Sequence, residues 1–123
     1  MLLLNLMVFY PRSGSAQSAT ATVAATEISA DLGACSALIT VTGADSKPIY
    51  SAKVNTRIQY GLLGMKKLDL EAYTGIGGQV KITNLPEVLK KPMFIHIGKD
   101  DKQETVEFKP NEHCHATFDV QLK

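Results

Sequence analysis

Residues 52–60 read Ala-Lys-Val-Asn-Thr-Arg-Ile-Gln-Tyr, and this stretch decides the fold class. One side of the stretch carries the small and mostly apolar residues Ala52, Val54, Thr56, Ile58 and Tyr60. The positions between them hold Lys, Asn, Arg and Gln. A period of two residues, rather than 3.6, predicts a β-strand with one buried and one solvated face.

The same alternation continues on both sides of this stretch. We expect six further strands, over residues 35–42, 68–73, 80–82, 93–97, 105–108 and 114–122. Gly-, Pro- and Asp-rich segments separate them, with one helical turn expected over 87–90. Seven short strands, each with one apolar face, predict an all-β fold in which two sheets pack together, an immunoglobulin-like or transthyretin-like sandwich. A closed barrel is the main competing architecture.

Composition sets the domain organisation. The chain has 123 residues, enough for one domain, and its 45% hydrophobic content is that of a globular protein. We place the sandwich at 35–123 and an N-terminal extension at 1–34. The formal net charge of +1 and the absence of Trp predict no nucleic-acid partner. The residues expected in the core are Val54, Ile58, Leu70, Ile82, Ile95, Val106, Phe118 and Val120.

The two cysteines, Cys35 and Cys114, fall on the apolar faces of the first and last predicted strands. We expect a disulfide between them, which would join the two ends of the domain. The alternative is a pair of buried thiols. A disulfide would place the protein in an oxidising compartment.

Several short motifs resemble those of carboxypeptidase-regulatory-like and transthyretin-like sandwiches. They are Thr-Gly at 42–43, Lys-Pro-Ile at 47–49, Ala-Lys-Val at 52–54, Gly-Gln-Val-Lys-Ile at 78–82 and Asn-Leu at 84–85. The resemblance implies a non-catalytic β-sandwich, used as a module of secreted and surface proteins.

The extension has two interpretations. Residues 2–10 are apolar, too short to span a bilayer, and similar to the hydrophobic region of a signal peptide, with residues 16–18 as a cleavage site and a linker following. However, no Lys or Arg precedes the run. The other interpretation is an arm resembling the donor strand of pilus subunits, which completes a neighbour's sheet. The residues expected to contact neighbouring subunits are then Leu2, Leu4, Leu6, Val8, Phe9, Val23, Ile28 and Leu32. Ser and Thr residues of the arm are possible sites of O-linked glycan.

Few side chains offer chemistry. His113 and His115 share one face of the last strand and are weak zinc or copper candidates, with solvent-facing histidines as the alternative. Asp100 and Asp101 at a hairpin tip are weak calcium candidates. No nucleophile motif is present in the sequence. We therefore expect no metal, no cofactor and no enzymatic activity.

The extension and the sandwich together predict a structural subunit of an extracellular or cell-surface filament or pilus, a homopolymer joined by N-terminal strand exchange. The alternative is a secreted or periplasmic binding or adhesion module that recognises glycan or protein. Neither interpretation requires a transmembrane span.

Overall fold

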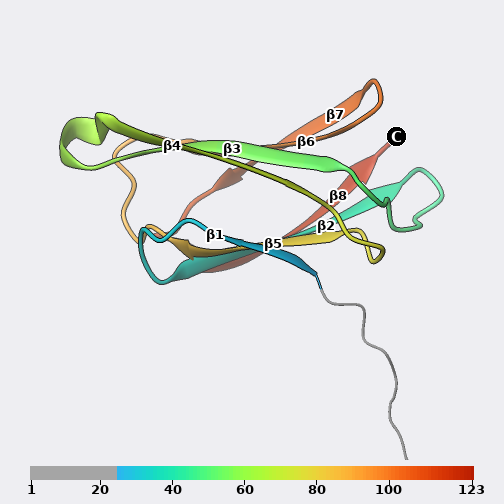
Figure 1. Cartoon of the computed structure of the whole chain (residues 1–123), viewed down its shortest axis with the longest axis horizontal. Helices are drawn as coiled ribbons and strands as arrows, with labels where there is room; N and C mark the ends of the chain where they lie inside the picture. Colours follow the sequence, from blue (N-terminus) through green and yellow to red (C-terminus); the bar gives the residue numbers. More distant parts are fainter. Residues whose placement is uncertain (1–24) are drawn as a thin grey trace, which may run out of the picture.

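Two four-stranded sheets face each other in the computed structural model, which describes residues 25–123 (Figure 1). The strands, in chain order, are β1 (Thr26–Ser29), β2 (Cys35–Gly43), β3 (Lys53–Tyr60), β4 (Lys66–Tyr73), β5 (Gln79–Leu85), β6 (Met93–Lys99), β7 (Lys102–Phe108) and β8 (His115–Leu122). One sheet has the order β1-β5-β2-β8 and the other β4-β3-β6-β7. The expected all-β class is confirmed.

The apolar faces of both sheets form one core. Along β3 the inward residues are Val54, Thr56 and Ile58, each almost fully buried, as the period of two predicts. Of the expected core residues, the buried ones are Val54, Ile58, Leu70, Ile82, Ile95 and Val120. Val106 and Phe118 are only partly buried. They lie on β7 and β8, and each of these is the last strand of its sheet.

The structure has eight strands in this range rather than the seven expected. The additional strand is β1, which lies within the predicted extension and runs parallel to β5. Ile28 and Leu32 pack against the core of their own domain, and Ala30 between them is buried. Beyond β1 the pairing continues, because the amide of Leu32 donates to the carbonyl of Asn84 at 2.8 Å.

The connections differ from expectation at two places. Residues 87–90, expected to form a helical turn, are bends without helical hydrogen bonding. A short 3₁₀ helix instead occupies η3 (Leu62–Gly64), between β3 and β4. Within residues 25–123, no helix is long and apolar enough to cross a membrane.

The predicted disulfide between Cys35 and Cys114 is confirmed. It joins the first residue of β2 to the residue that precedes β8. The backbone supports the same junction, because the amide of Ser36 donates to the carbonyl of Cys114 at 2.8 Å. Covalent and hydrogen-bonded links therefore fix the start of the parallel β2–β8 pair.

Candidate functional site

The outer face of the β4-β3-β6-β7 sheet carries the polar half of every alternating strand. Strand register places these side chains in rows across the sheet. The first row is Tyr73, Lys53, Gly98 and Gln103, and the second is Glu71, Asn55, His96 and Thr105. Residues directly opposite one another on a sheet face lie close enough to interact.

Cross-strand contacts organise these rows. Glu71 accepts a hydrogen bond from the hydroxyl of Tyr73 at 3.0 Å and lies 3.7 Å from the ammonium of Lys53. His96 Nδ1 lies 3.1 Å from the hydroxyl oxygen of Thr105. Tyr73, Lys53 and Glu71 therefore form one connected cluster, while His96 is held on the other side of Asn55.

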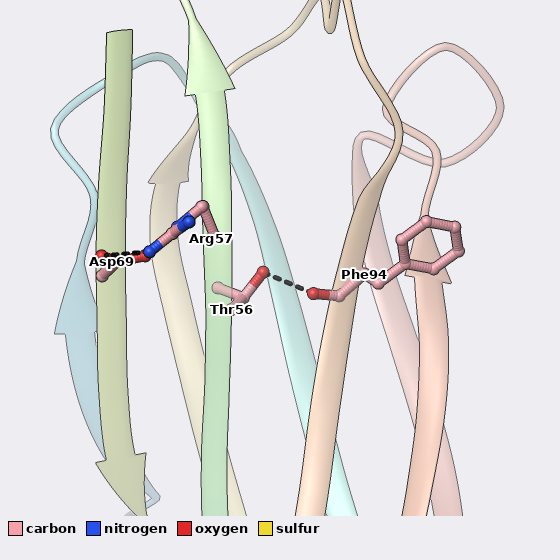
Figure 2. A network of polar contacts seen from close by, with 4 residues as sticks. All are labelled: Thr56, Arg57, Asp69 and Phe94. Carbon is pink, nitrogen blue, oxygen red and sulfur yellow. Dashed lines mark hydrogen bonds and ion pairs between the residues drawn. The ribbon is translucent and has the colours of Figure 1, made fainter.

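Figure 2 shows two adjacent residues of β3, Arg57 and Thr56, and the different partner that each of them contacts. The side chain of Arg57 donates to both carboxylate oxygens of Asp69, from Nε at 2.7 Å and Nη2 at 3.2 Å. Its neighbour Thr56 is buried, and its hydroxyl donates to the carbonyl of Phe94 at 2.7 Å. The β3–β6 ladder ends at the pair Thr56 and Ile95, so this hydroxyl continues the link between the strands beyond the ladder.

The pair of Arg57 and Asp69 sets the electrostatics of this end of the face. The hydrogen bond from Arg57 lowers the pKa of the Asp69 carboxyl below its ordinary value. The same hydrogen bond raises the pKa of Arg57. Both groups therefore stay ionised and neutralise each other. A second ion pair on the same two strands joins Lys53 to Glu71 at 3.7 Å.

A hollow of about 600 Å³ opens on this face where Gly98 contributes no side chain. It lies between Lys53 and Gln103, the residues paired with Gly98 on the two neighbouring strands. Asn55, Tyr73 and His96 also line it. A second hollow of about 550 Å³ shares Asn55 and His96 with the first and extends toward Arg57 and Asp69. The two together form what we call the sheet groove.

The sheet groove contains side-chain amides that can form hydrogen bonds with a ligand. Within residues 25–123, the side chains of Asn55 and Gln103 make no hydrogen bond to another residue. Tyr73 adds an aromatic ring that is about half exposed. Such a surface can hold a polar molecule through its amides and stack an apolar face of that molecule on the ring.

The two histidines proposed as metal ligands lie near each other, but the third histidine is not brought to them. His113 and His115 line a different hollow, between β7 and β8, and His115 Nδ1 lies 2.8 Å from the hydroxyl oxygen of Ser36. His96 lies on the other sheet. Among residues 25–123, no three His, Cys, Asp or Glu side chains are placed to hold a metal ion, and this includes Asp100 and Asp101.

The arm residues are only partly within the described range. Ile28 and Leu32 contact their own core, as given above. The remaining arm residues lie outside the described residues: Leu2, Leu4, Leu6, Val8, Phe9 and Val23.

Sequence reasoning did not single out the sheet groove. It placed Lys53 and Asn55 on the polar face of one strand, but gave no reason to join them to Tyr73 and His96. Strand register brings these residues together, and the hollow depends on Gly98. In the sequence, Gly98 indicates only that a strand ends there. The one available signal was the unbroken polar alternation of residues 53–57.

No protein-family model matches the sequence. No curated protein matches it either. Among solved structures, the fold is similar to that of catechol 1,2-dioxygenase from Acinetobacter sp. ADP1, in a structure inhibited by bound mercury. The TM-score is 0.51 at 14% identity, and the match covers 81% of this chain and 59% of the dioxygenase chain. The chain thus matches less than two thirds of the dioxygenase, and the likeness concerns the fold alone.

This comparison contradicts the expectation that the chain is not an enzyme. That expectation relied on the lack of a nucleophile motif and on the resemblance to non-catalytic sandwiches, and a β-rich fold similar to this one occurs in a dioxygenase. Fold does not separate enzymes from binding modules, because function depends on the site built on the fold. The expectation is therefore withdrawn.

Proposed function

We propose that this chain is a binding module of the cell surface or extracellular space, and that the sheet groove recognises glycan. The observation that carries the proposal is the hollow over Gly98, bordered by Lys53, Asn55 and Gln103 with Tyr73 beside it. The disulfide supports the compartment, because disulfides persist in oxidising environments. We propose in addition that the chain is a member of the transthyretin-like sandwiches.

The chemistry of the groove favours a neutral, hydroxyl-rich ligand. Lys53 pairs with Glu71 and Arg57 with Asp69, and the other two charged residues that line the groove, Lys99 and Asp100, carry opposite charges, so the groove has no net charge that would select an ionic ligand. The amides of Asn55 and Gln103 can each donate and accept, as sugar hydroxyls require. The ring of Tyr73 can pack against the apolar face of a sugar.

Calorimetric titration with cellotetraose, maltotetraose and chitotetraose tests this function. Gly98→Val should weaken binding, because its side chain projects into the hollow. A Cβ at Gly98 would contact no atom closer than 3.5 Å, so the fold should accept the change. Tyr73→Ala should weaken binding about tenfold.

Lys81→Ala is the matched control, since Lys81 is exposed on β5 of the other sheet. It should bind like the unmodified chain. If none of the three sugars binds, or if Gly98→Val binds as well as Lys81→Ala, the glycan proposal fails.

A second candidate function is strand exchange between subunits of a filament. The observation that favours it is β1, a strand from the predicted extension that pairs in parallel with β5 from Thr26 to Ser29. Because this segment adds to the edge of its own sheet, the part of the extension that would exchange is residues 1–24. Among residues 25–123, β8 pairs with β2 alone, so it offers an edge to such a strand. Exposed edges of this kind accept strands from other chains.

Electron microscopy of the full chain and of a chain lacking residues 1–24 tests strand exchange. The full chain should form regular fibres, and the shortened chain, which keeps β1, should remain monomeric. Fibres from both chains, or monomers from both, would contradict this function.

A further inference from the structure

The connection between β3 and β4 exposes three large apolar side chains at one end of the sandwich. Leu62, Leu63 and Met65 are 81%, 69% and 76% exposed. Val88, in the loop between β5 and β6, is 76% exposed as well. Figure 1 shows the η3 loop at the end of the molecule opposite the start of the described chain. We call Leu62, Leu63 and Met65 the apolar tip.

Neither packing nor backbone geometry accounts for leucine at position 63. Its side chain is mostly exposed, and its φ of 58° lies in the left-handed region that disfavours a branched, bulky residue. Gly61 and Gly64 on its two sides also have positive φ. A glycine or asparagine at position 63 would suit this turn better, so the leucine has another use.

Four lysines surround the apolar tip. Lys66 and Lys67 follow it directly in β4, and Lys90 and Lys91 come from the neighbouring loop. The two loops touch, because a Cβ on Gly64 would lie 3.1 Å from Cγ of Lys91. The ion pairs found between residues 25 and 123 join Lys53 with Glu71 and Arg57 with Asp69, so none of the four lysines takes part.

We propose that this end of the domain docks on an anionic lipid bilayer. Leu62, Leu63 and Met65 enter the interface between headgroups and acyl chains, and the four lysines contact anionic headgroups. The charge pattern and the projecting shape select this partner. A tight turn that projects apolar side chains enters a soft interface, and lysines around it match a layer of negative headgroups. The apolar tip shares no residue with the sheet groove, so the inference does not depend on the proposed function.

Flotation with vesicles tests the docking, using the full chain. Binding to mixed phosphatidylcholine–phosphatidylglycerol vesicles should exceed binding to phosphatidylcholine vesicles, and salt should weaken it. Leu62→Ser with Leu63→Asn should reduce binding at least about tenfold. Asn tolerates a positive φ, so this variant should fold. Lys66→Gln with Lys67→Gln should reduce binding about 30-fold.

A fluorescence experiment locates the contact. The chain contains no Trp, so Leu62→Trp introduces a single reporter. Its emission should shift to the blue on addition of the mixed vesicles. Ile76→Trp is the matched control, because Ile76 is 74% exposed in the turn before β5, and its emission should not change.

Equal vesicle binding by the Leu62→Ser, Leu63→Asn variant and the unmodified chain would overturn the proposal. So would an unchanged emission of Leu62→Trp. If the apolar tip is instead needed to bind a protein while vesicles have no effect, the surface is a protein interface and the lipid proposal is wrong.

Discussion

Adjacent residues of β3 have different environments and different roles. Thr56 faces the core, where its hydroxyl must have a hydrogen-bond partner and finds it in the carbonyl of Phe94. Arg57 faces solvent and pairs with Asp69. The contrast follows directly from the alternation of the strand, and it makes the outer side chains available for recognition without disturbing the core.

The pair of Arg57 and Asp69 has a testable titration. We predict that the pKa of Asp69 lies below its ordinary value and rises toward it in Arg57→Gln, because the hydrogen bond is lost. Since the folded-state pKa is the lower one, the pair favours folding above the unfolded-state pKa. That contribution disappears as the pH falls through the folded-state pKa. Carbon-13 NMR of the carboxyl measures it, and an unchanged pKa in Arg57→Gln would contradict the assignment. Lys53→Gln is the control and should leave a lowered pKa at Asp69.

Two phenylalanines of the edge strands differ in how deeply they are buried. Phe108 on β7 is 1% exposed, whereas Phe118 on β8 is only partly buried and lines the hollow between β7 and β8. Phe108→Ala should therefore cost about 3–5 kcal/mol of unfolding free energy. Phe118→Ala should cost less than about 2 kcal/mol, because its ring is partly in water already. Urea denaturation of both variants measures these losses in unfolding free energy. Equal losses would contradict the difference in burial between the two rings.

At the scale of elements, β1 and the disulfide close the fold from its two ends. β1 covers one edge of β5, and Ala30 and Leu32 beyond it continue the cover. The disulfide fixes β8 against the start of β2 on the other side of the same sheet. The sheet that lies opposite the sheet groove is thus the one with the additional restraints.

Removing the disulfide should cost about 4 kcal/mol, because its cysteines are 79 residues apart and a long loop gains much entropy in the unfolded chain. The variant is Cys35→Ser with Cys114→Ser, compared with the oxidised chain by urea denaturation. Cys114→Ser alone also removes the bond, so it should lose about as much stability as the double variant. Mass spectrometry of protein from its native compartment gives an independent check, and two free thiols there would contradict the bond.

At the scale of the whole molecule, local and non-local features differ in how far the sequence predicts them. Alternation of the kind seen in residues 52–60 is a local property, so each of the strands β2 to β8 could be predicted from its own residues. β1 lies in the arm that was expected to add to a neighbour's sheet, and its pairing with β5 of the same chain could not be predicted, since the two segments are distant in the sequence. The sheet groove has the same origin: Gly98 forms a hollow only because register sets it between Lys53 and Gln103.

The apolar tip escaped prediction for a different reason. Residues 61–64 read as a turn, and turn chemistry does not say whether Leu62 and Leu63 fold back on the core. The structure shows that they do not, because both are largely exposed. The two proposals made for this molecule therefore concern surfaces that neither composition nor strand pattern distinguishes.

The central claim, that the sheet groove binds glycan, is tested most directly by an NMR titration of the nitrogen-15-labelled chain. Cellotetraose, maltotetraose and chitotetraose are added in turn. We predict amide shifts confined to the groove, at Lys53, Asn55, Tyr73, His96 and Gln103 and their neighbours, for at least one of the three sugars. The absence of shifts with all three, or shifts centred on β8 or on the η3 loop, would contradict the claim.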